Sequence, residues 1–388
     1  MIPLAIPNVS GKEGEYLREC VDSNFVSSVG PFVERFEEAV AKASGAQFAA
    51  ATTSGTSGLH LALIAVGVRR DDLVILPSFT FIASANAITH SGATPWLFDV
   101  EARSWTLDPA QVKECLAAQT ERHGGELIHR KSRRRVGAIM PVYTLGMPAD
   151  MDAFRSISEE FRLPLVADAA AALGARYRGQ NLGKLADLTV FSFNGNKTIT
   201  CGGGGCVVGE QERLLQRIQH LSTQARSEPH CNHDEVGFNY RMTNLQAAVG
   251  CAQLERLEEL VLAKRGIAKL YNQAFMGMAG VGFLPEVTYA ESACWFSGIT
   301  INKPDLKDVS LLCQQMREQG IEGRTFWKPI HLQEPYSESP FTSFDVTERF
   351  WFRILTLPCS TNLTEKDQRK VIAVVSEIVT KSSRGILG

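Results

Sequence analysis

The sequence lacks an excess of charge of either sign. Its 388 residues include 40 lysines and arginines against 42 aspartates and glutamates, which gives a formal net charge of −2 and a pI near 6.5. Proteins that bind nucleic acids or membrane surfaces usually present a strong positive field. We therefore expect no nucleic acid and no membrane among its partners, while small anionic ligands remain possible at local sites.

Long apolar runs are also lacking. No stretch reaches the ~18 residues that span a bilayer, and residues 1–7 do not have the charged and apolar regions of a secretory signal. We expect a cytoplasmic protein. With 388 residues, 44% of them hydrophobic, the chain can build a large core. A chain of this length corresponds to about two domains.

The nine cysteines include no C-x-x-C pair. This spacing predicts dispersed thiols in a reducing compartment rather than a disulfide framework. Cys201 and Cys206 flank a glycine run and could hold a metal, but a second pair of ligands is missing, so we predict packing and no metal site. A nicotinamide-dependent oxidoreductase would need a G-x-G-x-x-G turn, and Ser54-Gly55-Thr56-Ser57-Gly58 does not supply one.

Short apolar runs alternate with helical segments in the first part of the chain. This alternation predicts an α/β fold with a mainly parallel sheet sandwiched by helices. In such sheets, ligands bind at the carboxyl ends of the strands. Residues 119–135 interrupt the pattern and predict a solvated surface insertion, with an anion-binding loop as the alternative. The expected strands are residues 48–51, 73–77, 94–100, 136–142, 165–167, 188–193 and 205–208.

The pattern becomes helical at residue 244. Leu254, Leu257 and Val261 recur at helical spacing, which predicts one long helix that leads into a smaller α+β domain. We therefore expect residues 1–250 to form an N-terminal segment and a large domain. Residues 251–388 would form the connecting helix and a small C-terminal domain.

Lys197 follows one apolar strand and precedes four consecutive glycines, and Asp168 ends another strand. A free lysine with a pKa of about 10.4 is almost fully protonated at neutral pH and is a poor nucleophile. Pyridoxal phosphate (PLP) holds a lysine amine in a Schiff base, while a carboxylate keeps its ring nitrogen protonated. Lys197 and Asp168 are our candidates for these roles. A surface lysine and a strand-end aspartate are the ordinary alternative.

A phosphate site is predicted at the turn before the apolar helical run that begins at Leu59. Residues 52–58 are all threonine, serine or glycine. Backbone N–H groups and the helix dipole attract a phosphate dianion at such a helix N-terminus. We predict Gly55 and Thr56 as the cradle, with a helix cap that binds no ligand as the alternative.

Four motifs then occur in order. They are Pro77-Ser78-Phe79-Thr80-Phe81, Asp168-Ala169-Ala170, the run from Phe191 to Lys197, and Gly237-Phe238-Asn239-Tyr240-Arg241-Met242. Over nearly its whole length the chain resembles the DegT/StrS-type nucleotide-sugar aminotransferases of PLP fold type I. The resemblance implies PLP as the cofactor, a large PLP-binding domain with a smaller C-terminal one, and a homodimer with shared active sites.

The resemblance also implies roles for single residues. Phe81 corresponds to the aromatic residue that stacks on the pyridine ring, for which a flat π face is suited. Ser192 corresponds to a ligand of the phosphate, and Asn239 to the residue that reaches the phosphate of the neighbouring subunit. A core phenylalanine and a structural strand serine are the alternatives for the first two.

Trp327, Lys328 and His331 match a segment that lies near the sugar nucleotide in this family, although a histidine in a turn is often structural. Lys197 is retained, which argues against the dehydratase branch of the family, where that lysine is replaced. Ala171 stands where many members have Gln, His or Glu. An alanine cannot donate or accept a side-chain hydrogen bond, so another group or water would have to make that contact.

Within the family, the chain is most similar to LegC-like members in residues 2–11, 24–28, 119–135 and 326–331. This likeness implies transfer of an amino group from L-glutamate to the C4 keto carbon of a UDP-linked 4-keto-6-deoxy-N-acetylhexosamine. The alternatives are a 3-keto sugar, a dTDP- or GDP-linked sugar, or a PLP-binding regulatory protein without turnover.

Overall fold

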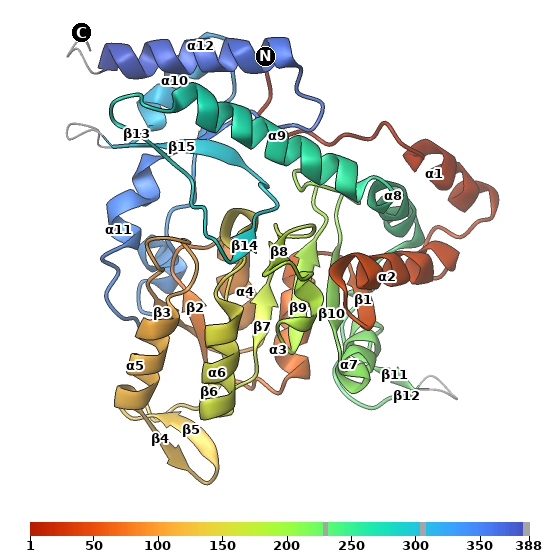
Figure 1. Ribbon diagram of the computed structural model, residues 1–388. Coiled ribbons are helices and arrows are strands. Elements are labelled where there is room, and N and C mark those ends of the chain that lie inside the picture. The colour runs from red at the N-terminus through yellow and green to blue at the C-terminus, as the bar shows by residue number, and fades with distance from the viewer. Residues whose placement is uncertain (228–231, 303–307, 383–388) are drawn as a thin grey trace.

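A computed structural model describes residues 1–227, 232–302 and 308–382 (Figure 1). Its centre is a sheet assembled from two ladders, in the orders β1-β10-β9-β7 and β3-β2-β6. Parallel bridges from Ile139 to Leu165 and from Val142 to Asp168 join β6 to β7. The strands are β1 (Phe48–Thr52), β2 (Leu73–Pro77), β3 (Thr94–Phe98), β6 (Val136–Ile139), β7 (Val166–Asp168), β9 (Leu188–Ser192) and β10 (Gly205–Gly209).

Parallel pairing predominates in this sheet, as the sequence predicts. β2 pairs in parallel with β3 and β6, and β7 pairs in parallel with β9. β10 is the exception, because it runs antiparallel to both β1 and β9. All seven expected strands are present within a few residues of their predicted bounds.

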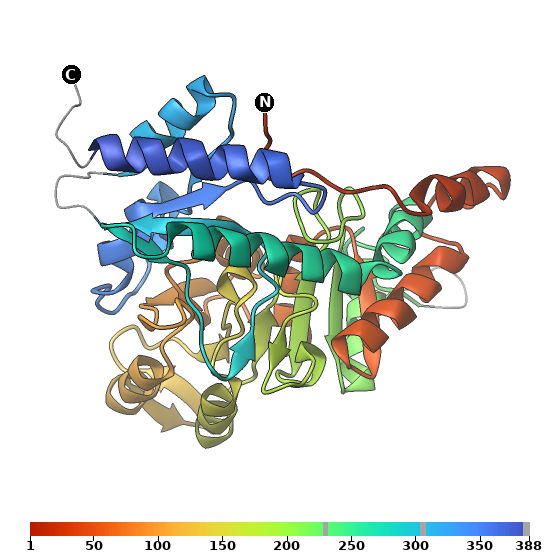
Figure 2. The same cartoon turned by 45° about the horizontal axis from the view of Figure 1, so that its top comes forward.

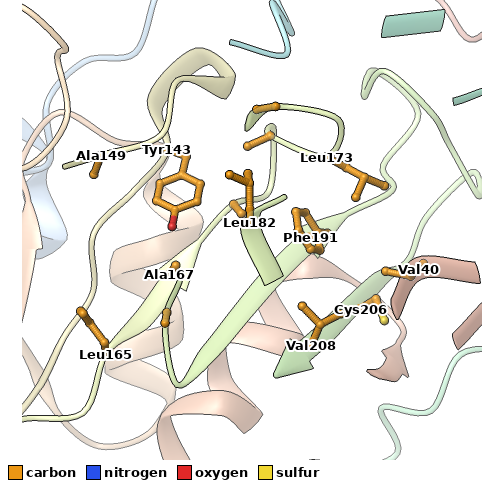
Figure 3. Close-up of a cluster of buried hydrophobic side chains, with 14 of the residues drawn as sticks. Val40, Tyr143, Ala149, Leu165, Ala167, Leu173, Leu182, Phe191, Cys206 and Val208 are labelled. Atoms are coloured by element: carbon orange, nitrogen blue, oxygen red, sulfur yellow. The ribbon is translucent and has the colours of Figure 1, made fainter. Parts of the chain in front are cut away.

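Helices cover both faces of the sheet because alternate residues of the same strand point to opposite sides. In β2, Leu73 and Ile75 belong to one core cluster, whereas Val74 and Leu76 belong to the other. Figure 3 shows part of the first cluster, where Leu165, Ala167, Phe191 and Val208 lie together. This face carries α2 (Pro31–Ser44), α5 (Pro109–Gln119), α6 (Met151–Phe161) and α8 (Asn244–Leu254), and the other face carries α3 (Gly55–Ala65), α4 (Ile82–His90) and α7 (Glu212–Ser222).

A smaller antiparallel sheet in the order β13-β15-β17-β16 follows the central sheet in the chain. Helix α9 crosses above the central strands, and α12 lies on the outer side of the smaller sheet (Figures 1 and 2). Ile2 and Leu4 pack into this C-terminal core, and Ile2 pairs with Ile321. The elements are β13 (Val281–Phe283), β15 (Ser297–Ile301), β16 (Arg324–Thr325), β17 (Ile354–Leu357), α9 (Leu257–Phe275), α10 (Ser310–Glu318) and α12 (Glu365–Ser382).

The prediction of a single long helix from residue 244 is wrong, because two helices, α8 and α9, occupy this region. Glu255, at the break, accepts hydrogen bonds from Tyr16 at 2.6 Å and Arg35 at 2.7 Å. Arg256 has φ −113° and ψ 9°, outside the helical range, and donates to Glu259. Polar contacts to the N-terminal helices therefore replace the helical turn that the apolar spacing predicts.

Residues 119–135 form a β-hairpin of β4 (Thr120–His123) and β5 (Glu126–His129). The solvated insertion expected from the sequence is accurate for the tip, where His123 to Gly125 are exposed. The base of the insertion is fixed to the sheet, because Arg135 forms a partly buried bidentate pair with Asp72. Arg134 also donates to Thr94 at 2.7 Å.

The described cysteines do not form disulfide bonds. Eight cysteines are described, and all eight are free thiols; Cys201, Cys206 and Cys251 are buried. Cys231 lies outside the described residues. In the described part of the chain, no helix combines the length and apolar character needed to cross a membrane. The elements not yet named are α1 (Glu13–Asp22), α11 (Thr347–Phe350), β8 (Arg176–Tyr177), β11 (Arg226–Ser227), β12 (Asn232–His233) and β14 (Ala290–Glu291), with 3-10 turns at Thr144–Gly146, Leu182–Lys184, Ile330–Leu332, Glu334–Tyr336 and Trp351–Arg353.

Candidate active site

A cavity of about 570 Å³ lies at the carboxyl ends of the central strands. The loops and helix starts that follow β1, β2, β7 and β9 line it, and the smaller C-terminal sheet closes it from the other side. Its lining includes seven sequence-predicted residues, namely Gly55, Thr56, Phe81, Asp168, Ser192, Lys197 and Trp327. Residues from five separate segments of the chain thus meet in one cavity.

Asp168 ends β7 and is only 5% exposed. Ser84 on α4 donates a hydrogen bond to its Oδ2 at 2.6 Å, and the Ala170 amide donates to its Oδ1 at 3.0 Å. Burial raises the pKa of this carboxyl, while the two hydrogen bonds and the charge of Lys197 oppose that shift. The carboxylate is therefore oriented toward the cavity by partners on both oxygens.

Lys197 lies in the loop after β9, and its backbone N–H donates to the Asn194 carbonyl at 2.9 Å. Burial lowers the pKa of its ammonium group to about 8, partly offset by the charge of Asp168. At pH 7 about one molecule in ten would then carry a neutral amine, far more than for a free lysine. The side chain is thus closer to a nucleophile and base than an exposed lysine is.

Gly55 and Thr56 begin α3, and their position fits an anion. Ser54 caps the helix, because its hydroxyl accepts from the Ser57 amide at 3.0 Å. The first amides of a helix have no acceptor within that helix, so those of Gly55 and Thr56 can donate to a ligand. A Cβ on Gly55 would lie 2.8 Å from the Ser192 Cβ. The lack of a side chain at Gly55 therefore lets Ser192 approach the helix start.

The glycines after Lys197 have a backbone role. Gly202 and Gly204 have φ of +77° and +133°, which L-residues rarely adopt. A Cβ on Gly205 would lie 2.4 Å from the Ser54 carbonyl oxygen. The glycine run thus lets the lysine loop pack directly against the turn before α3.

Phe81 and Trp327 face each other across the opening, with ring centroids 5.7 Å apart. Phe81 is 52% exposed, unusual for a phenylalanine, whereas its motif neighbour Phe79 is fully buried. The alternative of a core phenylalanine thus describes Phe79 rather than Phe81. Ala171 also lines the cavity, so a methyl group faces the site at that position.

A model of the DegT/DnrJ/EryC1/StrS aminotransferase family matches residues 7–376. The chain belongs to this family. The match begins before α1 and ends within α12, so it includes both walls of the cavity.

Named relatives agree with this membership over their full length. EpsN of Bacillus subtilis, assigned as a pyridoxal phosphate-dependent aminotransferase, is 37% identical over 380 residues, covering 96% of this chain and 95% of EpsN. GDP-perosamine synthase of Caulobacter vibrioides is 35% identical over 381 residues, covering 97% and 98%. The family match and these relatives together show that the chain is a PLP-dependent sugar aminotransferase.

Solved structures lead to the same fold. DesV of S. venezuelae, solved in complex with a ketimine intermediate, superposes with a TM-score of 0.84 at 30% identity and covers 95% of this chain and 94% of its own. A DegT DnrJ EryC1 StrS aminotransferase from Brucella abortus superposes with a TM-score of 0.86 at 26% identity, covering 95% of both chains. The expectations of PLP fold type I, of PLP as cofactor and of an aminotransferase are confirmed. The nicotinamide-dependent and regulatory alternatives are thereby set aside.

The residues of this DegT-family site fit PLP. The open amides at Gly55 and Thr56, with Ser192 beside them, match its phosphate. The buried carboxylate of Asp168, held by hydrogen bonds, would keep the ring nitrogen of PLP protonated. The amine of Lys197 would join the aldehyde carbon of PLP. The LegC-like subgroup remains a prediction, as do the individual contacts of these residues.

Three predicted residues lie outside the lining of this cavity. Asn239 is exposed, in a segment held by the Phe238 amide bond to Leu221 at 2.7 Å. Lys328 is exposed as well. His331 is packed: its Nδ1 lies 2.6 Å from the Ser78 hydroxyl and its ring stacks on Phe344. The contacts of His331 match the structural alternative.

The sequence reasoning missed three residues of the site. Ser84 orients Asp168, Trp295 contacts Lys197, and Arg324 supplies a second cation to the cavity lining. Ser84 lies three residues after Phe81 at the start of α4 and could have been found by placing that motif on a helix. Trp295 and Arg324 belong to the C-terminal sheet region, whose approach to the cavity has no local signal in the sequence.

Another groove, of about 670 Å³, lies between α2, the α8–α9 break and residues 174–181. Its charged groups include Arg35, Glu255 and Arg265, which pair with other protein groups. It contains none of the predicted residues. The strand-end cavity is therefore the better candidate for the active site.

Proposed function

We propose that this protein transfers an amino group from L-glutamate to the C4 keto carbon of a nucleotide-linked 4-keto-6-deoxy sugar. The observation that carries the proposal is the placement of Lys197 and Asp168 in a cavity that also has a cation and two aromatic rings at its opening. Both substrates are anions, which suits Arg324. Flat aromatic surfaces suit a sugar ring and a nucleotide base.

The chemistry divides among the residues of the cavity. Bound PLP would supply the electron sink and carry the amino group between the two substrates. The amine of Lys197 takes the proton from the α-carbon of the donor and returns a proton at the sugar carbon, for which its lowered pKa is suited. Asp168 holds a proton on the ring nitrogen. The aromatic side chains limit the access of water.

Two nucleotides are candidates for the sugar donor. The LegC-like sequence features favour a UDP-linked 4-keto-6-deoxy-N-acetylhexosamine. Three relatives named GDP-perosamine synthase, at 35%, 32% and 34% identity, favour a GDP-linked sugar. With these relatives, the GDP-linked sugar is as well supported as the UDP-linked sugar.

A substrate panel tests the proposal. Purified protein with PLP and glutamate is offered UDP-, GDP- and dTDP-linked 4-keto sugars and a 3-keto sugar, and products are identified by mass spectrometry and NMR. We expect amination at C4 of a UDP- or GDP-linked sugar together with formation of 2-oxoglutarate. Amination of the 3-keto sugar alone would overturn the proposed carbon.

We also propose that the active unit is a homodimer in which Asn239 of one protomer binds the cofactor phosphate of its partner. Asn239 is exposed and outside its own cavity lining, although Arg241, two residues later, is anchored to Glu37 at 2.6 Å. The segment is thus held by its neighbours, while the asparagine itself is exposed. A second copy of this chain would give that side chain a partner.

Subunit mixing tests this shared site. Lys197→Ala and Asn239→Ala homodimers are each expected to be nearly inactive. In a mixed dimer, one of the two sites combines the intact Lys197 of one chain with the intact Asn239 of the other. After random exchange of equal amounts, half of the dimers are mixed, so about a quarter of all sites should regain activity. Absence of recovery after exchange verified by mass, or an active monomer in sedimentation, would refute the shared site.

A further inference from the structure

The ammonium group of Lys197 lies over an aromatic ring. Its Nζ lies 3.7 Å from the centroid of the Trp295 indole. Trp295 is 3% exposed and precedes β15 in the C-terminal part of the chain. A cation above an indole face is attracted by the ring quadrupole, and more strongly where water is excluded. The catalytic lysine thus touches a residue from the opposite wall of the cavity.

Hydrogen bonds of its side chain and its backbone hold Trp295 in place. Its indole N–H donates to the Asn196 carbonyl at 2.8 Å, the peptide directly before Lys197. Its backbone N–H donates to Leu145, and its carbonyl accepts from the Lys264 ammonium at 3.0 Å. Lys264 is itself 2% exposed and also donates to the Cys359 carbonyl at 2.7 Å. The indole is therefore fixed both to the C-terminal core and to the lysine loop.

The charge of Asp168 acts on Lys197, although the two side chains form no ion pair. Asp168 is the one carboxylate among the described residues of the cavity lining, and Ser84 and the Ala170 amide already donate to its oxygens. Tyr143 and Arg324 line the same cavity, and Lys264 lies behind the indole. No carboxylate of the described chain forms an ion pair with Lys197, so the indole face is its direct partner.

We propose that Trp295 is a positioning residue that holds the amine of Lys197 over its indole face whenever the lysine is not joined to the cofactor. In that position the amine is kept inside the cavity, where it can exchange a proton with a bound donor. The role depends on the amino transfer proposed above. Capture of PLP by the lysine, however, requires neither glutamate nor sugar, so it tests the indole separately.

Two variants separate the ring face from the N–H group. Trp295→Phe and Trp295→Leu both lose the bond to Asn196 and both leave a smaller apolar side chain, but only Phe keeps a π face. The measurement is the pH dependence of the rate at which added PLP develops its protein-bound absorption band. Because the ring stabilises the charged amine, we expect the midpoint for Leu to lie about half to one pH unit below that for Phe.

The donor half-reaction supplies a second readout. With glutamate and the PLP-loaded protein, we expect the single-turnover rate at saturating donor to be about tenfold lower for Leu than for Phe, because the amine loses its orientation. The half-saturating glutamate concentration should be unchanged. Trp351→Leu, outside the cavity, is the matched control and should behave like the unaltered protein.

Fluorinated tryptophan keeps the test valid if Trp295→Leu fails to fold. Fluorine withdraws charge from the ring face with little change of shape, so the midpoint should fall stepwise with the number of fluorines. All five tryptophans are replaced in this way, and the same series in Trp295→Phe should show no trend. Equal midpoints for Phe and Leu, or no trend with fluorination, would overturn the proposal even if the protein proves to be an active aminotransferase.

Discussion

The two walls of the cavity differ in how far their charged groups are exposed to solvent. The sheet wall consists of Gly55, Thr56, Asp168, Ser192 and Lys197, which lie at strand ends and a helix start of the central sheet. The C-terminal wall consists of Trp295, Phe296, Arg324, Phe326 and Trp327. Asp168 in the sheet wall is 5% exposed and both of its oxygens accept hydrogen bonds, whereas the charged group of the C-terminal wall, Arg324, has a side chain that is 63% exposed.

This difference indicates a division of labour. A buried carboxylate and a lysine with a lowered pKa suit a group that stays in the site through each turnover. An exposed guanidinium at the opening suits ligands that enter and leave. We therefore expect changes in the sheet wall to reduce the rate of chemistry, and changes in the C-terminal wall to reduce affinity for substrates.

The largest effect is expected for Lys197→Ala. Loss of both the nucleophile and the proton carrier should reduce kcat by about 10⁴-fold or more, while the fold persists. Borohydride reduction of the PLP-loaded protein, followed by peptide mass mapping, should label Lys197 in the unaltered protein. Lys184→Ala removes an exposed lysine that pairs with Glu210 and should change neither result. Label on a different lysine would contradict the assignment.

A smaller but still large effect is expected for Asp168→Asn. The substitution keeps the shape of the side chain but removes the negative charge that stabilises the protonated ring nitrogen. We therefore expect kcat to fall by about 10²- to 10³-fold. PLP should still bind, which its absorption spectrum reports. Asp152→Asn changes an exposed carboxylate and serves as the control. An unchanged kcat would place the charged partner of the cofactor elsewhere.

The sequence predicts the sheet wall well for a physical reason. Its residues follow directly after apolar strands, so local patterns place them at the carboxyl edge where Gly55, Asp168 and Lys197 meet. The C-terminal wall depends on how a second sheet folds back over the first. Trp327 was proposed only through family resemblance, and Trp295 and Arg324 were missed, because no spacing along the chain brings them near Lys197.

Dependence on distant contacts also explains why the prediction of one unbroken helix was wrong. The apolar spacing at Leu254, Leu257 and Val261 is helical, but it does not reveal that Glu255 binds Tyr16 and Arg35 and interrupts the helix. The role of His331 near the sugar nucleotide stays a prediction, and its observed partners Ser78 and Phe344 come from distant positions. Local periodicity thus predicts elements, and long-range polar pairs decide where they end.

For the C-terminal wall, Arg324→Gln should raise KM about tenfold for both glutamate and the nucleotide sugar, with kcat nearly constant. The guanidinium pairs with Glu322, which also accepts from the Leu4 amide at 2.9 Å, so the cation is held at the opening. Because the group is largely exposed, its contribution is modest. Arg369→Gln, on the outer helix α12, is the control. A fall in kcat with unchanged KM would contradict the division between the two walls.

The smallest effect is expected for Ser84→Ala, which removes a donor to Asp168 without touching either substrate. Burial raises the pKa of Asp168 and the Ser84 hydrogen bond lowers it. Losing that bond should raise the pKa further, so the acid limb of the kcat profile should move to higher pH, with about a threefold loss of kcat at neutral pH.

Ser91→Ala is the matched control at the end of the same helix, where the hydroxyl donates only to the Ile88 carbonyl at 2.7 Å. It should leave the acid limb in place. A shift to lower pH in Ser84→Ala would mean that the hydroxyl stabilises the protonated carboxyl instead. In that case Asp168 would not enter the reaction as the charged partner of the ring nitrogen, and the sheet wall would lose the fixed negative charge that sets it apart from the C-terminal wall.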